Sequence, residues 1–355
     1  MGKKIIVAGY YGCGNLGDDA ILLGFLEGMQ KAGVAVEVMS GAPEETNRLY
    51  GVPAFDRRDS KQFAAEMQNA DALVFAGGSI FQDVSSTRSV FYYSNLVKTA
   101  KSAKKKVIML GQGVGPLTSF LGKSAARSAF NAADVIAVRD PASVTSLKEL
   151  GFKGMPRVTG DMAFLLPPLK QEESMSQEYG MANMKTVGIS ARPFKGIDVV
   201  KVFGELARQL FTAGYLPVLI EMDREADGPL IMELDKVMGG KVPSMRRLPN
   251  PMQYQQRVRR MDSVIAMRLH AGILAAMVGV PTVMVAYDPK VTAMAKQLDL
   301  PTPVAFTKEV TAQRIFDNFQ QAMRTRDTWV KSMERKVVEQ RKAAELNIEL
   351  LMSAL

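Results

Sequence analysis

SVIAMRLHAGILAAMVGVPTVMVAYDPK, residues 263–290, contains a short apolar strand, a small-residue helix and a second apolar strand in direct succession. This succession is typical of a parallel sheet covered by helices. The first strand ends on Arg268 and His270, which is the single histidine of the chain. Alternate strand residues share a face, and strand ends opposite helix N-termini collect anions. We therefore expect Arg268, His270 and, after the second strand, Lys290 at an anion site. Position alone would favour a buried core histidine, but the neighbouring cations favour a functional one.

The same alternation extends through the chain in two series. The apolar runs of the first are KKIIVAG, VAVEVMSG, DALVFAGG, KKVIMLGQG and DVIAVRD, and those of the second are TVGISARP, YLPVLIEM, SVIAMRL and PTVMVAY. Polar QEESMSQEYGMANMK separates the two series. We predict an α/β protein with two Rossmann-like domains, residues 1–168 and 185–307, joined by a linker, 169–184, and followed by a helical segment, 308–355. An amphipathic helix packed on the body is the favoured role of that segment, with membrane or partner docking as the alternative.

Composition limits the classes of partner. The chain has 355 residues, too many for one core, and a net charge of +9, which favours anionic partners. Only 7% aromatic residues and no nucleic-acid motif argue against nucleic acid. One cysteine fits a reducing cytoplasm, and the run IIVA is too short for a signal peptide. The longest uncharged stretch is broken by Gly279 and Pro281. We expect a cytoplasmic protein whose membrane contact, if present, is peripheral, at the inner face.

A glycine-rich loop follows the first strand. Gly12, Gly14 and Gly17 match the spacing of the dinucleotide fingerprint, but the strand ends two residues too early for it. Asp18 and Asp19 occupy the helix N-terminus where a pyrophosphate would bind, and their charges would repel it. We therefore disfavour NAD binding.

Two residues of the same loop have competing interpretations. Asn15 or Asp18 is expected to cap the helix, which leaves the other free to face a ligand. Cys13 could be a nucleophile, but the sequence places no histidine or basic partner near it, so a small loop residue is favoured.

Three further strand ends of the first series carry the polar loops GGSIFQD, GQGVGPL and RDPAS. Gln82, Asp83 and Gln112 could hydrogen-bond sugar hydroxyls there, although turn chemistry explains each of them singly. Arg139 is either a structural ion-pair partner or an anion-binding fork.

The motifs GYYGCGNLGDDAIL, GGSIFQD, GQGVGPL, VRDPAS, GDMAF, ISARP, RLHAG and YDPKV occur in this order across residues 5–291. Together they resemble the polysaccharide pyruvyltransferase family, most closely its CsaB-like cell-wall branch. The resemblance implies a GT-B-like fold with two domains facing across a cleft. It also implies transfer of pyruvate from phosphoenolpyruvate, as a ketal, to two hydroxyls of one sugar, typically N-acetylmannosamine in a lipid-linked precursor. The usual glycine triplet appears here as Gly77, Gly78 and Ser79, which adds a hydroxyl on the acceptor side.

By the same resemblance, the phosphoenolpyruvate-binding residues are Arg139, Arg268, His270 and Lys290, and Asp18 lies near the reacting groups. Phosphoenolpyruvate carries a carboxylate and a phosphate, so a site needs several fixed cations. Imidazole ordinarily exchanges protons near neutral pH, so we assign His270 as general acid or phosphate donor and Asp18 as the base. The acceptor-binding candidates are Asn15, Ser79, Gln82, Asp83 and Gln112. We expect no metal and no cofactor, with phosphoenolpyruvate as donor substrate.

Three alternatives remain open from the sequence. The first is a GT-B glycosyltransferase that uses a nucleotide sugar, whose diphosphate would occupy the same strand end. The others are a glycan-binding module without catalysis and an NAD oxidoreductase. The acceptor sugar, its linkage, its attachment to a lipid diphosphate and the oligomeric state are not determined by the sequence.

Overall fold

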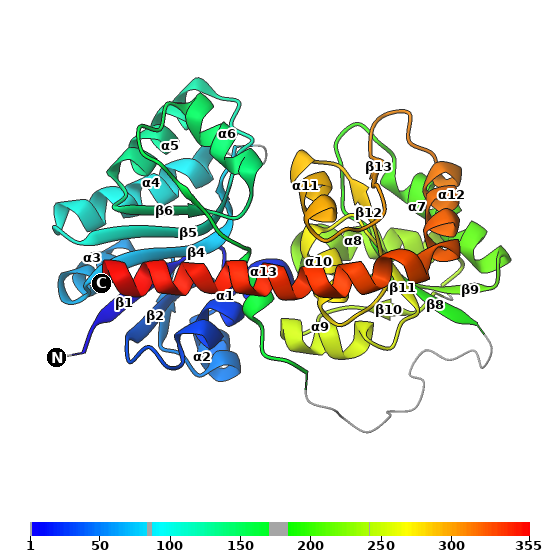
Figure 1. Cartoon of the computed structure of the whole chain (residues 1–355), viewed down its shortest axis with the longest axis horizontal. Coiled ribbons are helices and arrows are strands. Elements are labelled where there is room, and N and C mark those ends of the chain that lie inside the picture. Colours follow the sequence, from blue (N-terminus) through cyan, green and yellow to red (C-terminus); the bar gives the residue numbers. More distant parts are fainter. Residues whose placement is uncertain (1, 84–86, 170–183, 241) are drawn as a thin grey trace. The chain divides into compact units, whose positions relative to one another are not determined.

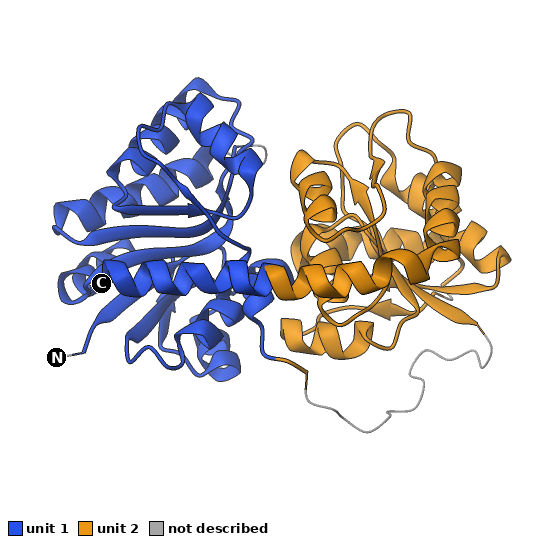
Figure 2. Cartoon of the chain, viewed as in Figure 1, with its two compact units in different colours: residues 1–167, 340–355 blue, residues 168–339 orange. Residues whose placement is uncertain are grey.

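The computed structural model describes residues 2–83, 87–169, 184–240 and 242–355. The chain divides into two compact units, residues 1–167 with 340–355 and residues 168–339, called unit 1 and unit 2 (Figure 2). The first boundary falls one residue from the predicted end of the N-terminal domain. Most of the predicted linker, residues 170–183, lies outside the described residues.

Unit 1 contains a seven-stranded parallel sheet with the order β3-β2-β1-β4-β5-β6-β7 (Figure 1). Its strands are β1 Lys4–Ala8, β2 Ala35–Ser40, β3 Ala54–Asp56, β4 Ala72–Phe81, β5 Lys106–Val114, β6 Val135–Val138 and β7 Arg157–Val158. Its helices are α1 Leu16–Met29, α2 Pro43–Tyr50, α3 Ser60–Asn69, α4 Thr87–Ser102, α5 Phe120–Ala132, α6 Pro141–Leu150 and the 3-10 helix η1 Met162–Leu165. The strand order reverses between β1 and β4, which is the position where Rossmann sheets bind ligands.

Unit 2 repeats this topology with a sheet of order β10-β9-β8-β11-β12-β13. Its strands are β8 Lys185–Ser190, β9 Tyr215–Ile220, β10 Ser244–Met245, β11 Ser263–Ala266, β12 Thr282–Ala286 and β13 Val304–Ala305. Its helices are α7 Val199–Thr212, α8 Arg224–Val237, α9 Pro251–Val258, α10 Leu269–Met277, α11 Pro289–Gln297 and α12 Ala312–Arg324. Here the order reverses between β8 and β11, the strand that ends just before Arg268. The prediction of two parallel-sheet α/β domains is confirmed.

Both sheets are covered on their two faces, which explains their continuous apolar runs. In unit 1, side chains of α3, α4, α5 and α6 form one core layer with the sheet, while α1 and η1 pack together. In unit 2, α7, α8 and α12 form the corresponding layer, and Tyr254 of α9 donates a hydrogen bond to Ala271 of α10 at 2.8 Å. The polar strand ends therefore emerge from an apolar scaffold.

The C-terminal helix α13, Arg326–Ala354, belongs to both units (Figure 2). Residues 308–339 of the predicted helical segment fall in unit 2 and residues 340–355 in unit 1. Within unit 1, the fully buried Asn347 accepts a hydrogen bond from Thr159 at 2.7 Å and donates one to the Gly160 carbonyl at 3.0 Å. The Gly160 amide donates to the Ala343 carbonyl at 3.1 Å. Among the described residues, none of the helices has the length and apolar character needed to span a bilayer.

Candidate functional site

The carboxyl ends of three neighbouring strands in unit 2 carry basic and aromatic side chains. Arg192 follows β8, Arg268 follows β11 and Tyr287 follows β12. The strand ends are joined directly, since the Met267 amide donates to the Ser190 carbonyl at 2.7 Å. His270 lies in the first turn of α10 and Lys290 in the first turn of α11. The fold therefore places four basic side chains, those of Arg192, Arg268, His270 and Lys290, at one edge of the unit 2 sheet.

Arg268 is held by a buried carboxylate that the sequence analysis did not identify. Its Nε lies 3.1 Å from both oxygens of Asp227, which is fully buried on α8, and its Nη2 lies 3.5 Å from Asp223. Asp227 is itself fixed by the backbone amides of Met222 and Asp223. Burial alone would lower the pKa of Arg268, but the charge and hydrogen bonds of Asp227 raise it above its ordinary value. The guanidinium is therefore a permanently charged group in a fixed orientation.

Tyr287 brings two more cations together. The guanidinium of Arg192 lies 4.4 Å from the centroid of the Tyr287 ring, and the Lys290 ammonium lies 5.7 Å from it. Lys290 also forms an ion pair with Asp288, the N-cap residue of α11, at 3.6 Å. Cation–π contacts orient the guanidinium without neutralising its charge. Arg192 is thus a fourth basic residue at this edge. Arg192 was not predicted as a site residue. Its place in the motif ISARP, just after a strand, is the sequence feature that could have identified it.

His270 is half-buried, and Arg268 is the N-cap residue of its helix. The side chain of Arg268 makes no capping hydrogen bond to the helix. The first-turn amides of α10 therefore face the strand end without a side-chain cap from this residue, an arrangement that favours an anion. His270, Arg268 and Lys290 are brought to the same edge, as the sequence analysis expects.

In unit 1 the two carboxylates that follow the glycine-rich loop, those of Asp18 and Asp19, have different environments. Asn15 caps α1 by accepting hydrogen bonds from the amides of Gly17 and Asp18 at 2.9 and 3.3 Å. Asp19 is buried and accepts the Gly12 amide at 2.9 Å. Asp18 is half-buried, and a Cβ built on Gly78 would lie 3.4 Å from its carboxylate, so it borders the glycines of β4. The expectation that Asn15 or Asp18 caps the helix is confirmed, with Asn15 as the cap.

Arg139 lies in unit 1 and is buried with partners of its own domain. Its Nη1 forms an ion pair with Asp161 at 2.8 Å, and its Nη2 donates to the Ser79 hydroxyl at 2.9 Å. Asp161 also caps η1 through the Ala163 amide. Arg139 therefore forms a structural ion pair, which is the first of the two interpretations offered by the sequence. Its assignment to phosphoenolpyruvate stays a prediction, as does that of Ser79 to the acceptor.

Two of the remaining acceptor candidates, Asp83 and Gln112, form hydrogen bonds with other residues of unit 1. The Asp83 carboxylate accepts four hydrogen bonds from Thr118 and Ser119 at 2.7 to 3.0 Å. Burial would raise the pKa of Asp83, but these bonds outweigh burial and lower it. Gln112 is fully buried, and its amide donates to two backbone carbonyls at 3.1 Å. Gln82 is half-buried beside Asp83. Their proposed contact with sugar hydroxyls stays a prediction.

Cys13 has no basic partner in the neighbouring sequence, as expected, but the fold brings one to it from a distant position. Nη1 of Arg57, which follows β3, lies 3.4 Å from the Cys13 sulfur, and the same guanidinium lies about 5 Å from the rings of Tyr10 and Tyr92. The contact joins residues 44 positions apart, which local sequence cannot indicate. Burial nevertheless raises the pKa of the thiol, because it outweighs the arginine charge. The thiol is therefore protonated at neutral pH and weakly nucleophilic.

The fold of the chain is similar to that of known GT-B-like proteins. A Listeria monocytogenes protein assigned as a UDP-N-acetylglucosamine 2-epimerase superposes with a TM-score of 0.71 at 10% identity, over 100% of this chain and 96% of that one. MnaA of S. aureus in its UDP co-structure gives 0.67 at 10% identity, over 99% and 95%. The glycotransferase of kitacinnamycin gives 0.58 at 14% identity, over the whole of both chains. Two Rossmann-ordered sheets and these likenesses define a GT-B-like protein.

Comparison of sequences identifies the family to which the chain belongs. The model of the family polysaccharide pyruvyl transferase matches residues 15–289, most of the chain. The amylovoran biosynthesis protein AmsJ of Erwinia amylovora is 23% identical over 368 aligned positions, which cover 84% of this chain and 86% of AmsJ. The chain belongs to the polysaccharide pyruvyl transferase family.

Proposed function

We propose that this chain transfers pyruvate from phosphoenolpyruvate, as a ketal, to a sugar of a cell-wall polysaccharide precursor and releases phosphate. N-acetylmannosamine is the proposed acceptor sugar. Family membership supports pyruvyl transfer to a polysaccharide. The observation that carries the choice of donor is the gathering of Arg192, Arg268, His270 and Lys290 at the carboxyl edge of the unit 2 sheet.

The donor and this edge are chemically complementary. Phosphoenolpyruvate presents a planar carboxylate and a phosphate, and guanidinium groups bind both with paired hydrogen bonds. Asp227 fixes Arg268 and Tyr287 orients Arg192, so that little side-chain freedom would be lost on binding. The first-turn amides of α10, which has no side-chain cap, add further N–H donors for phosphate oxygens.

The proposed reaction proceeds through an oxocarbenium-like centre at C2 of the donor. A proton is added to the C3 methylene, one sugar hydroxyl attacks C2 and loses its proton, and the C2–O bond to phosphate breaks. The second hydroxyl of the same sugar then attacks C2 and loses its proton, which closes the ketal. The two hydroxyls lose two protons in all. One of these balances the proton added to C3, and the other is taken up by the released phosphate. We assign His270 as general acid or phosphate donor and Asp18 as the base.

The acceptor side of the proposal rests on unit 1. Asp18 borders the glycines of β4, which allow a sugar to approach the backbone closely. Asn15, Ser79, Gln82, Asp83 and Gln112 remain the proposed acceptor residues, and Arg139 a proposed donor ligand. No cofactor or metal takes part in the proposed reaction. We place it in the cytoplasm, with peripheral contact to the inner membrane face if the glycan is carried on a lipid diphosphate.

The test is a phosphate-release assay with phosphoenolpyruvate and a panel of N-acetylhexosamine acceptors. We expect release only with donor and acceptor together, and a loss of at least 100-fold in kcat/KM for Arg268→Ala and His270→Ala. Lys290→Ala is compared with Lys296→Ala, an exposed lysine at the other end of α11. Unchanged turnover in Arg268→Ala or His270→Ala would refute the site.

A nucleotide-sugar transferase is the alternative, and the family match does not favour it. Titration with UDP and with phosphoenolpyruvate separates the two functions. Micromolar binding of UDP together with indifference to phosphoenolpyruvate would support the alternative.

A further inference from the structure

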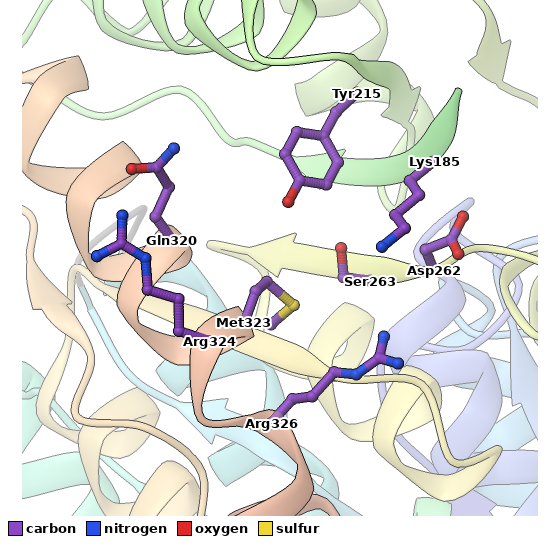
Figure 3. Close-up of a pocket in the computed structure, with 8 residues that line it drawn as sticks. All are labelled: Lys185, Tyr215, Asp262, Ser263, Gln320, Met323, Arg324 and Arg326. Atoms are coloured by element: carbon purple, nitrogen blue, oxygen red, sulfur yellow. The ribbon is translucent and has the colours of Figure 1, made fainter. Parts of the chain in front are cut away.

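A polar cavity lies at the edge of the unit 2 sheet opposite the candidate site, where the strands begin (Figure 3). Lys185, Tyr215 and Ser263 line it, and they are the first residues of β8, β9 and β11. The end of α12 contributes Gln320, Met323 and Arg324, and the start of α13 contributes Arg326. The donor residues proposed above in unit 2 follow the carboxyl ends of β8, β11 and β12, so the cavity is separate from them.

The charge of this cavity is predominantly positive. Its lining contains three cationic side chains, those of Lys185, Arg324 and Arg326, and one carboxylate, that of Asp262. One oxygen of Asp262 already accepts hydrogen bonds from the amide and hydroxyl of Thr186, at 2.8 and 3.2 Å. Within the described part of the chain, Lys185 and Arg324 form no ion pair, whereas Arg326 pairs with Asp327 at 3.5 Å. The carbonyl end of α12 and the amide end of α13 meet here with opposite dipoles, so the side-chain cations determine the sign of the potential.

Ser263 supplies independent evidence for a ligand. Its side chain is 1% exposed, and its hydroxyl has no hydrogen-bond partner among the described residues. In Figure 3 this oxygen points toward the space that the Lys185 ammonium and the Tyr215 hydroxyl also face. A buried hydroxyl without a partner is unfavourable, and a bound acceptor would satisfy it.

The remaining walls indicate the ligand's chemical class. The Tyr215 ring, packed edge-on against Phe319 with centroids 5.4 Å apart, and the Met323 thioether are less polar than the rest of the lining. The cavity volume of about 370 Å³ is within the range of small-molecule sites. A planar ring and a thioether would contact an organic body, whereas the cations would bind an anionic head.

We propose that this cavity binds a phosphate monoester with a ring-sized organic part. Lys185, Arg324 and Arg326 bind the phosphate, the Ser263 hydroxyl donates to one of its oxygens, and Tyr215 and Met323 contact the organic part. This inference does not depend on the reaction proposed above.

The chain contains its own reporter for a test. Trp329 is the single tryptophan, and its indole N–H donates to the Ala322 carbonyl at 3.1 Å, beside Met323 on α12. The full chain is titrated with inorganic phosphate, glucose 1-phosphate and uridine monophosphate while Trp329 emission is followed. We expect saturable binding of at least one monoester, at least fivefold tighter than that of inorganic phosphate, which lacks the organic part.

Two variants test the assigned contacts. The double variant Lys185→Gln with Arg324→Gln is expected to weaken monoester binding about tenfold, because it removes two charges that contact the phosphate. Ser263→Ala is expected to weaken binding about fivefold without lowering the free energy of unfolding, because its hydroxyl has no partner in the fold. A Ser263→Ala variant that binds normally, or that loses stability, would overturn the role given to this residue.

Control variants show whether the change in Trp329 emission arises from binding in this cavity. Arg314→Gln removes one positive charge from an exposed part of α12 outside the cavity and should leave binding unchanged. Lys290→Gln, at the carboxyl edge, should also leave it unchanged. The proposal is overturned if no monoester gives a saturable response at millimolar concentration, or if Lys290→Gln abolishes the response while the double variant does not. The phosphate-release assay is read separately, so either proposal can fail alone.

Discussion

At the scale of single residues, the candidate site depends on a carboxylate, that of Asp227, which holds a substrate-binding arginine and does not itself contact substrate in the proposed reaction. Asp227 is fully buried, yet it accepts hydrogen bonds from Arg268 and from two backbone amides. A buried pair of this kind adds little net stability, but loss of one partner leaves the other without compensation. Asp227 is therefore a positioning residue for Arg268.

We expect Asp227→Ala to lower the free energy of unfolding by about 3 to 5 kcal/mol, because it leaves the Arg268 charge and two amides without their acceptor. Urea denaturation followed by Trp329 emission measures this, since both residues belong to unit 2. Glu233→Ala, an exposed acidic residue on the same helix, is the control and should change little. Equal stability of the two variants would contradict the positioning role.

Asp83 gives a prediction in acid. Hydrogen bonds from Thr118 and Ser119 hold its pKa below the ordinary 3.8, so the folded protein binds this proton more weakly than the unfolded chain. Its contribution to stability is therefore complete well above pH 3.8 and is lost as the pH falls through the lowered folded pKa. Hydrogen exchange at the Ser119 amide should accelerate over that acid range. In Asp83→Asn the exchange should already be fast at neutral pH, and slow exchange there would contradict the assignment.

The same residues show how far sequence can identify a site. Arg268, His270 and Lys290 follow apolar strands, and a strand end is visible in the sequence. Their partners are not: Asp227 lies 41 positions from Arg268, and Asp161 lies 22 positions from Arg139. Side-chain pairs of this kind are fixed by tertiary packing, which local pattern does not encode.

At the scale of elements, prediction succeeds where a strand has two neighbours. Each of the nine apolar runs quoted from the sequence overlaps a strand of the two sheets. The strands without a corresponding run are β3, β7, β10 and β13, all two or three residues long and all at sheet edges. An edge strand is buried by fewer neighbours and carries too few residues to show a period. The sequence therefore predicts the centre of each sheet better than its margins.

The glycine-rich loop offers an element-scale test with an internal control. Gly12 and Gly33 both have φ of +63°, but a Cβ on Gly12 would overlap the Ser40 hydroxyl and lie 3.0 Å from the Ala42 amide, whereas nothing lies within 4 Å of one on Gly33. Gly33→Ala should cost about 1 kcal/mol from backbone strain alone. Gly12→Ala should cost at least about 2 kcal/mol more, because the loop must move.

Urea denaturation of the two glycine variants gives the difference in their free energies of unfolding directly. Equal costs would show that the contacts of Gly12 with Ser40 and Ala42 contribute nothing, and that the loop is set by its φ angles alone.

At the scale of the whole molecule, α13 is the element that belongs to both units. Met333 is fully buried in its unit 2 part, and Ala344, Asn347 and Leu351 are fully buried in its unit 1 part. The sequence predicts a helix packed on the body but not this division, because one amphipathic pattern continues through both parts. Each part therefore has its own anchor, and the two can be disturbed separately.

Gly160 is the position at which this separation can be tested. A Cβ there would lie 2.7 Å from the Ala344 nitrogen and 2.8 Å from the Gln340 carbonyl oxygen, and neither backbone atom can give way without shifting the helix. We expect Gly160→Ala to accelerate hydrogen exchange in residues 340–355 and 157–166, while Met333 keeps residues 326–339 protected. Gly2→Ala, whose Cβ would have 3.7 Å of clearance, should leave the pattern unchanged. Exchange that accelerates equally along all of α13 would show that the helix responds as one rigid rod and that its two anchors are not independent.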